Sequence, residues 1–383
     1  MASLRGIMPV PPRTRARADL SALREQVSEA VGVVPDPLTG RSLADIGMVG
    51  DVECEGDMLR VSVWRPAVDS PGDVGLKQRV ETAVRSVEGV REVGVRLKPM
   101  DDARRTDLAL RLRQSRHRPG GLGDRTAIYA VGSGKGGVGK STLTANLAVS
   151  LARTGRRVGV LDADVWGYSM PQLLGVREPP VAVKGIMLPV PAHGIALMSV
   201  GFFVGDDEPV VWRGPMLHKA IEQFLDDVYW GDLDVLLVDL PPGTGDVTLS
   251  IAELLPDAAM LVATTPQAAA EQVAARVGRM ARDARMPVAG VVENMSGTVC
   301  AHCGETTAAF GSGGGRRLAA TLDTELLGEV PLDPALCEAG DAGTPLVLAH
   351  PASASARALA RVAEALPVVR RSVVGRSLPL FVS

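Results

Sequence analysis

Residues 128–142 read Ile-Tyr-Ala-Val-Gly-Ser-Gly-Lys-Gly-Gly-Val-Gly-Lys-Ser-Thr, and this stretch decides the fold. Within it, residues 134–141 satisfy G-x-x-x-x-G-K-[ST], the loop that wraps around phosphate groups. An apolar run at 128–131 leads into the loop as a strand, and a helical pattern at 141–153 leads out of it. The glycine N–H groups and the N-terminus of that helix attract anions. The sequence therefore predicts a nucleoside triphosphate site.

Lysine usage points to the same loop. The chain has six lysines among its 41 basic residues, and two of the six are Lys135 and Lys140. Lysine is a compact ammonium that fits between phosphate oxygens, whereas arginine is a planar fork. Lys140 is expected to reach the β- and γ-phosphates, and the Ser141 hydroxyl to bind Mg²⁺. The residues predicted to contact the nucleotide are Gly134, Lys135, Gly136, Gly137, Val138, Gly139, Lys140, Ser141 and Thr142.

Length and composition describe a chain of two or three globular domains. It has 383 residues, of which 46% are hydrophobic and 22% charged. The net charge of −3 gives no reason to expect nucleic acid as a partner. No apolar run approaches the ~18 residues of a membrane span. Residues 1–18 lack the apolar core of a secretory signal, and their Pro and Arg content favours a disordered leader over a transit peptide. We expect a cytoplasmic protein.

Residues 19–98 are predicted to form a small α+β domain. A helical pattern at 19–30 precedes strand-like runs at 48–54 and 58–64, and a helix at 76–87 and a strand at 90–97 follow. Residues 99–125 are rich in arginine and end in a Pro-Gly-Gly turn. We therefore expect a linker there, partly helical near 108–112.

Residues 126–370 alternate strand and helix patterns, which predicts an α/β domain with a mostly parallel sheet flanked by helices. Ligands bind such sheets at the carboxyl ends of the strands. Strands are expected at 128–131, 157–162, 195–200, 235–240, 258–264, 288–293 and 326–330. Helices are expected at 141–153, 215–228, 267–284, 313–322 and 352–366, before a tail at 371–383.

Carboxylates follow two of these strands. Asp162 and Asp164 close one strand, and two carboxylates so near each other are costly unless a cation or water network needs them. Beside a Mg²⁺–nucleotide, one can orient the attacking water, and we assign that role to Asp164. Asp239 ends another strand and is expected to hold Mg²⁺. Gly243 follows it, placed so that its backbone N–H can sense a γ-phosphate.

Polar groups also end the last two predicted strands. Asn294 closes one, and Pro331 and Asp333 close the other. An amide and a carboxylate at adjacent strand ends can read the edge of a purine, and they can equally cap loops.

Cys300 and Cys303 form a C-x-x-C pair just after Asn294. Two thiolates do not complete a four-coordinate site, but two chains related by a two-fold axis supply four. The pattern favours an iron–sulfur cluster at a dimer interface, ahead of zinc in the same geometry or a redox dithiol. Cys54 and Cys337 lack partners in the sequence and are interpreted as structural.

These motifs resemble the Mrp/ApbC-type iron–sulfur cluster carrier ATPases, which have a deviant Walker A loop like that of the MinD/ParA group. The resemblance lies in residues 132–151, 162–169, 211–215, 230–246, 264–267, 291–296, 310–315 and 327–333, together with the two cysteines. Plain MinD/ParA relatives lack the C-x-x-C. In that group, a lysine at the position of Lys135 reaches across a dimer to the partner's nucleotide. Residues 166 and 168, Trp and Tyr here, depart mildly from the pattern.

The resemblance implies an ATP hydrolase that binds Mg²⁺ and ATP, forms a homodimer and holds a [4Fe–4S] cluster between its subunits. It implies transfer of the cluster to apo iron–sulfur proteins, gated by ATP. A ParA/MinD-like positioning ATPase and a zinc-bridged regulatory ATPase are the alternatives. Residues 1–100 resemble, less strongly, the small iron–sulfur assembly domain that precedes such ATPases. The cysteine usual near its residues 69–72 is missing here, which favours docking over cluster binding.

Overall fold

A computed structural model describes residues 13–55, 58–70, 72–114, 122–123, 125–203, 214–299 and 306–368. The chain divides into two compact units, Met1–Gln114 and Ser115–Ser383, and each is described by itself. The predicted leader and tail lie largely outside the described residues, although the helix expected from residue 19 begins at Arg13.

The first unit is a three-stranded sheet with helices. Strands β1 (Val49–Glu55), β2 (Met58–Arg65) and β3 (Glu92–Pro99) lie in that order, with β1 antiparallel and β3 parallel to β2. The β2–β3 crossover is helix α2 (Asp73–Arg85), and α1 (Arg13–Gly32) packs against β1 and α2. Alternate residues of β2, including Val61 and Val63, are buried, as a half-covered sheet requires.

Helix α3 (Asp102–Gln114) occupies much of the segment that we predicted as a linker. It buries Leu108, Ala109 and Leu112 within the first unit, and Arg105 donates to the carbonyl of Pro66. Because of their spacing, these three apolar residues lie on one face of the helix. An arginine-rich segment can therefore form a helix with one buried face.

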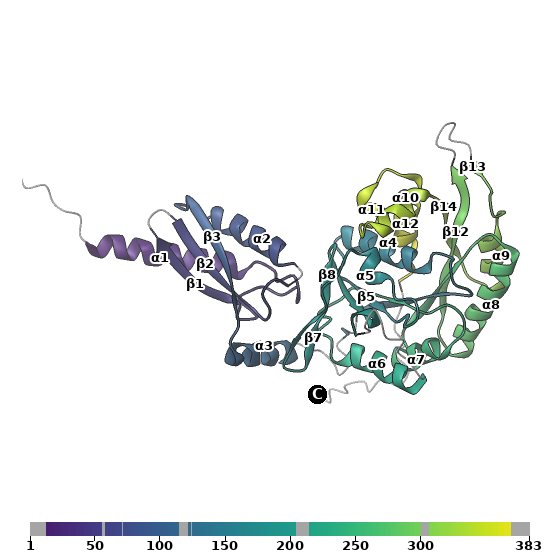
Figure 1. The fold of residues 1–383 in the computed structure, drawn as a ribbon, viewed down its shortest axis with the longest axis horizontal. Coiled ribbons are helices and arrows are strands. Elements are labelled where there is room, and N and C mark those ends of the chain that lie inside the picture. The colour runs from purple at the N-terminus through teal and green to yellow at the C-terminus, as the bar shows by residue number, and fades with distance from the viewer. Residues whose placement is uncertain are drawn as a thin grey trace, which may run out of the picture. The chain divides into compact units, whose positions relative to one another are not determined.

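The second unit is a mostly parallel α/β sheet (Figure 1). Its strand order is β13-β12-β11-β4-β10-β5-β9-β8, with β14 also paired to β12. The antiparallel pairs are β12 with β13 and β8 with β9. The strands are β4 (Ala127–Ser133), β5 (Val158–Asp162), β8 (Val190–Ala192), β9 (Ile195–Ser199), β10 (Val235–Asp239), β11 (Ala259–Thr264), β12 (Val288–Val299), β13 (Thr306–Thr307) and β14 (Leu326–Leu332). A separate small hairpin joins β6 (Val181–Val183) and β7 (Ile186–Leu188).

Helices cover both faces of this sheet (Figure 1). One face carries α4 (Lys140–Arg153), α5 (Met170–Leu173), α10 (Pro334–Asp341), α11 (Leu346–Ala349) and α12 (Ala354–Ala365). The other carries α6 (Gly214–Asp226), α7 (Asp246–Leu254), α8 (Ala268–Asp283) and α9 (Gly314–Thr321). A short 3₁₀ helix, Val200–Phe203, follows β9.

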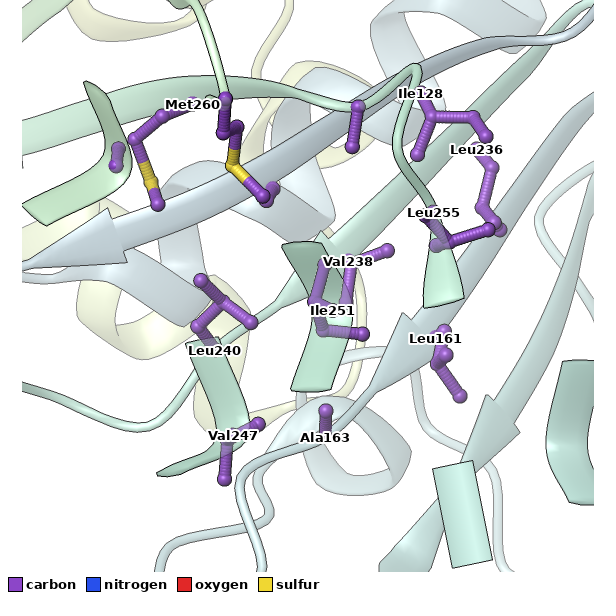
Figure 2. Packing of buried hydrophobic residues seen from close by; sticks show 14 of the residues in the cluster. Ile128, Leu161, Ala163, Leu236, Val238, Leu240, Val247, Ile251, Leu255 and Met260 are labelled. Carbon is purple, nitrogen blue, oxygen red and sulfur yellow. The ribbon is translucent and has the colours of Figure 1, made fainter. Parts of the chain in front are cut away.

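The core lies in two layers because strand residues alternate between the faces. In β10, Leu236 and Val238 join the cluster under α6 and α7, whereas Val235 and Leu237 join the cluster under α4 and α12. Figure 2 shows the first cluster, in which Ile251 of α7 packs near Val238. Runs of apolar residues without polar alternation are typical of such doubly covered strands.

The predicted fold class is confirmed, and every strand and helix predicted for the second unit is present within a few residues. The sequence analysis did not indicate the helices α5, α7, α10 and α11 or the short strands β6, β7, β8 and β13. The largest difference is β12, which extends six residues beyond its expected end at 293, to Val299. None of the helices in the described part of the chain is long and apolar enough to cross a membrane.

Candidate nucleotide and cluster site

The phosphate-binding loop joins β4 to α4 at the carboxyl edge of the parallel sheet. Gly139 precedes the helix in the left-handed region, with φ of 82°, and Gly137 has φ of 77°. A side chain at these positions would be strained, which explains the need for glycine. Gly134 meets α8, because a Cβ there would lie 2.4 Å from the backbone N of Ala274. The loop is therefore fixed between two helices.

Asp239 holds the start of α4. Its Oδ2 accepts from Lys140 Nζ at 2.7 Å and from Ser141 Oγ at 2.6 Å, and its Oδ1 accepts from Thr144 Oγ1 at 2.8 Å. Asp239 is completely buried and Lys140 is 6% exposed. One carboxylate thus orients the ammonium and the hydroxyl that the motif assigns to phosphate and magnesium.

Asp162 lies beside Asp239 on the neighbouring strand β5, in register with it. Burial, together with the charge of Asp239, raises the pKa of Asp162 to about 7. Its carboxyl group accepts from Ser199 Oγ at 2.9 Å and from the backbone N–H of Asp164 and Met170 at 3.2 Å each. Asp162 therefore fixes the backbone on which Asp164 sits.

Asp164 faces the lysine of the loop. Its Oδ2 lies 3.9 Å from Lys140 Nζ, and its Oδ1 accepts from the backbone N–H of Gly167 at 3.0 Å and of Trp166 at 3.3 Å. Burial raises the pKa of Asp164, and the charge of Lys140 opposes that rise. A carboxylate held in this way can accept a proton from water or orient it.

A cavity of about 430 Å³ lies over the loop. Its volume is in the range of small-molecule sites in proteins. It brings together the loop and the segment after β5, and Trp166, which is 70% exposed, stands at its side. Its lining residues are Ser133, Lys135, Gly136, Gly137, Val138, Gly139, Lys140, Ser141, Thr142, Asp164, Trp166, Gly167 and Pro242.

Two predicted residues have other partners. Lys135 is exposed, and its Nζ donates to Gln267 Oε1 at 3.2 Å. Gln267 in turn accepts from Thr265 Oγ1 at 3.1 Å. The backbone N–H of Gly243 donates to the carbonyl of Ser133 at 2.8 Å. Gly243 can therefore contact a γ-phosphate only after this bond to the loop is exchanged.

The residues predicted to read a purine do not line this cavity. Asp333 caps α10 through the backbone N–H of Ala335 at 3.0 Å, and the carbonyl of Pro331 accepts from Ser355 Oγ at 3.4 Å. Asn294 Nδ2 donates to the carbonyl of Val138 at 2.9 Å, whereas its buried Oδ1 has no partner among the described residues. Purine recognition by these three residues stays a prediction.

Cys300 and Cys303 lie outside the described residues. The strands on either side of them are described: β12 ends at Val299 and pairs antiparallel with β13, through Thr298 with Thr307 and Val299 with Thr306. In the sequence, the C-x-x-C therefore falls between strands β12 and β13. Cys54 is half-buried and Cys337 is exposed on α10.

The groups present fit a Mg²⁺–nucleotide. Mg²⁺ binds hard oxygen ligands, and Ser141 Oγ and both oxygens of Asp239 meet at the start of α4. A magnesium ion held there would neutralise phosphate charge, beside the loop N–H groups and Lys140.

A P-loop NTPase is defined by a glycine loop between a central parallel strand and a helix, together with an acid at the end of the adjacent strand. Comparison with known proteins shows to which family of P-loop NTPases the chain belongs. Residues 124–367 match the family described as NUBPL iron-transfer P-loop NTPase, and residues 24–96 match the family described as iron-sulfur cluster assembly protein. The chain belongs to the NUBPL iron-transfer P-loop NTPase family. The predicted resemblance and the predicted class, a P-loop ATP hydrolase, are thereby confirmed.

Three relatives illustrate the match. The iron-sulfur cluster carrier protein of Mycobacterium tuberculosis is 46% identical over 369 residues, which cover 94% of this chain and 97% of that protein. The protein of the same name from Deinococcus radiodurans is 43% identical over 348 residues, covering 90% of this chain and 95% of the relative. A solved structure, the nucleotide-binding protein of Archaeoglobus fulgidus in complex with ADP, is 36% identical and covers 61% of this chain and 90% of its own, with a TM-score of 0.50.

Sequence reasoning missed several polar residues of the site. Thr144 binds Asp239, Ser199 binds Asp162, and Gln267 binds Lys135. For Thr144 a signal was available, because it lies four residues after Lys140 on the same face of a helix. Ser199 ends strand β9 and Gln267 comes shortly after β11, and their partners could not be foreseen because the sequence does not give the order of the strands in the sheet.

Proposed function

We propose that this chain is an ATP-dependent iron–sulfur cluster carrier. It holds a [4Fe–4S] cluster at a homodimer interface through Cys300 and Cys303 of each subunit and passes it to apo iron–sulfur proteins. The family supports iron transfer, and relatives that match more than nine-tenths of the chain are named iron-sulfur cluster carrier proteins.

The observation that carries the proposal is the position of the cysteine pair. It falls between β12 and β13, and β12 passes the phosphate-binding loop before it reaches the hairpin. A [4Fe–4S] cluster takes four thiolates, and each chain offers two in this pattern. A two-fold axis through the site completes the set and explains why the chain needs no third cysteine nearby.

ATP has a gating role in this proposal. Lys140 and Ser141 bind the phosphates and Mg²⁺, Asp239 orients both, and Asp164 orients the attacking water. Lys135 is exposed and lines the cavity, which supports a role for its ammonium toward the nucleotide of a second subunit. Hydrolysis would then gate the transfer of the cluster to a recipient.

Anaerobic reconstitution with iron and sulfide tests the cargo. The full chain should gain a broad visible absorption band, about four iron and four sulfide per dimer, and a dimer mass in solution. Cys300→Ala and Cys303→Ala should each lose the band. Cys337→Ala, which removes an exposed cysteine outside the hairpin, is the matched control and should reconstitute like the wild-type protein.

A colourless dimer that binds zinc stoichiometrically through the same cysteines would overturn the cluster assignment in favour of a zinc-bridged ATPase. Transfer is tested by mixing the loaded carrier with an apo iron–sulfur enzyme and following the recovery of its activity. A transfer rate that is unchanged by ATP and by Lys140→Ala would overturn ATP gating while leaving the cargo intact.

A further inference from the structure

A second cavity, the α4–α12 cavity, lies between helices α4, α11 and α12. The three helices lie together in Figure 1, and both α11 and α12 contact α4. The volume of the cavity is about 460 Å³, which is in the range of small-molecule sites in proteins. It shares no lining residue with the cavity over the phosphate-binding loop. The nucleotide site therefore does not account for it.

The two cavities lie at opposite ends of one helix. The phosphate-binding loop leads into the start of α4 at Lys140, whereas the second cavity is lined by Ser150 and by residues that follow it. Ser150 comes ten residues after Lys140, and a helix rises by about 1.5 Å for each residue, so about 15 Å separates the two along the helix axis. A phosphate group bound by Lys140 thus cannot also contact Ser150.

Small side chains on α12 leave the space of this cavity. Ala356, Ala360 and Ala363 follow one another at intervals of four and three residues, so they lie on one face of the helix. Ala356 and Ala363 are almost fully buried, and so are Leu151 of α4 and Val347 of α11, which line the same cavity. The inner wall is therefore apolar and suits an aliphatic group.

Ser150 adds an unpaired hydroxyl to this wall. The residue lines the cavity and is 7% exposed, and its Oγ has no hydrogen-bond partner among the residues that the structure describes. A buried hydroxyl without a partner is unfavourable, and a hydrogen bond to a ligand would remove that cost. The position of Ser150 therefore points to a polar group that enters the cavity.

Two arginines give the cavity its charge. Arg153 is held in place, because its guanidinium donates to the carbonyl of Val347. The side chain of Arg156 is exposed and has no hydrogen bond or ion pair with any other residue that the structure describes. Glu364 is the acid among the lining residues, so two arginines against one glutamate leave one positive charge. The planar fork of an arginine matches the oxygens of a carboxylate or a phosphate.

We propose that the α4–α12 cavity binds a small organic anion with an aliphatic body. Its carboxylate or phosphate lies toward Arg153 and Arg156, and its aliphatic part packs on Ala356, Ala360 and Ala363. Such a ligand suits both kinds of lining group. An inorganic anion would leave the apolar wall in water, and a neutral hydrocarbon would leave the arginines without a partner. The assignment goes beyond cluster transfer and depends on neither the cysteines nor their cargo.

Hexanoate is the first probe, because it joins a carboxylate to a short aliphatic chain, and hexyl phosphate tests the other anionic group. Acetate lacks the chain and 1-hexanol lacks the charge. Binding to the full chain is measured by ligand-observed NMR titration. We expect the better of the two anionic probes to bind at least about tenfold more tightly than acetate and 1-hexanol, the factor that one charge-assisted hydrogen bond contributes. Saturating Mg-ADP should not displace it.

Two variants locate the bound probe. Ala360→Leu fills the cavity with a residue that also favours a helix, and Arg156→Gln removes a charge. Each should weaken binding by at least about tenfold. Ala354→Leu and Arg361→Gln are the matched controls, because both positions are exposed on α12 and neither lines the cavity. These two variants should bind the probe as the wild-type chain does.

Ser150→Ala tests the unpaired hydroxyl. Its loss should weaken probe binding while the free energy of unfolding stays the same or rises, because the hydroxyl has no partner to lose. Binding of Mg-ADP shows whether each variant is folded, and if Ala360→Leu unfolds, Arg156→Gln and Ser150→Ala decide. Three results would overturn the assignment: no preference for the anionic probes over acetate and 1-hexanol, displacement of the probe by Mg-ADP, or full binding by the folded cavity variants.

Discussion

Lys140, Ser141 and Thr144 all bind one carboxylate, Asp239, and this arrangement explains the residue types of the loop. The Lys140 ammonium donates to Asp239 and to the Ser141 hydroxyl and has a third proton left for phosphate. Arginine would place a planar fork there in place of this compact charge. The chain uses arginine for nearly all its other cationic positions, so lysine in the loop reflects the chemistry of the site.

Lys140→Ala should abolish ATP turnover while leaving reconstitution of the cluster intact. The variant removes the charge that stabilises the phosphates, and we expect a loss in kcat of at least about 100-fold. Steady-state phosphate release and visible absorption after reconstitution measure the two effects. Lys219→Ala, at an exposed position of α6, is the control and should keep the wild-type rate. Parallel loss of turnover and cluster would show instead that the variant unfolds.

Asp164→Asn tests the assignment of the water. Its remaining carbonyl oxygen can still accept from the N–H groups of Trp166 and Gly167, so the local backbone is preserved. We expect kcat to fall by about 10²–10⁴-fold, the usual contribution of a positioned acid or base, with nucleotide affinity little changed. Single-turnover hydrolysis and equilibrium binding measure the two quantities separately. Normal hydrolysis by this variant would show that another group orients the water.

At the scale of elements, β12 connects the sheet, α9 and β13. Glu293 is 1% exposed, and its Oε2 accepts from the backbone N–H of Gly315 in the first turn of α9. A carboxylate at a helix N-terminus is favourable, because it meets free N–H groups and the positive end of the helix dipole. Arg317 of α9 bonds to Glu271 of α8 at 2.9 Å, so the same helix end is also fixed to its neighbour.

Glu293→Gln should remove a pH dependence of stability. Burial raises the pKa of Glu293 above the model-peptide value of 4.5, and the charge of Glu329 adds to the rise, although Gly315 N–H, Arg317 and Arg316 oppose it. The folded chain therefore holds a proton that the unfolded chain has lost, and stability falls as pH rises from 4.5 through the raised pKa.

Denaturant unfolding at a series of pH values from 5 to 8 measures this effect. Glutamine keeps an oxygen that can accept from Gly315, so the helix end stays capped while the titration disappears. The unfolding free energy of the wild-type chain should fall relative to that of the variant as the pH rises. A constant difference over the series, or a rise of wild-type stability with pH relative to the variant, would contradict the assignment.

Strands β4, β5 and β10 could be predicted because a short apolar run bounded by turn residues is typical of a buried strand. The left-handed backbone of Met295 and the irregular pairing of β12 with β14 around it could not be predicted, since they depend on which strands lie side by side. Asp239 could be identified because an acid that ends an apolar strand, in a chain with a phosphate-binding loop, is typical of the residue that holds Mg²⁺. The bond of Asn294 to the loop could not be predicted either, because only the sheet order brings the two together, and its contact with a base stays a prediction.

At the scale of the whole molecule, two compact units share one chain, and the first has its own buried anchor. Arg65 at the end of β2 is completely buried between two carboxylates: it bonds to Asp36, and its Nε donates to Asp73 Oδ1 at 2.8 Å. These contacts join the turn after α1, the sheet and the start of α2. Asp73 also accepts from the N–H of Ser70, in the loop before α2. The buried arginine thus also helps to fix the start of this loop.

Arg65→Ala should unfold the first unit while leaving the second intact. The substitution leaves Asp36 and Asp73 buried without a counter-charge, which costs about 3–5 kcal/mol, a large share of the stability of a unit this size. Amide hydrogen exchange resolved by mass spectrometry should show loss of protection in β1–β3 and full protection in β4 and β10, with ATP hydrolysis retained. Arg85→Ala is the control, because the exposed pair of Arg85 with Glu81 contributes only about 0.5 kcal/mol. Exchange that rises together in both units would show that they fold as one, and the first unit would then be part of the ATPase rather than a separate domain.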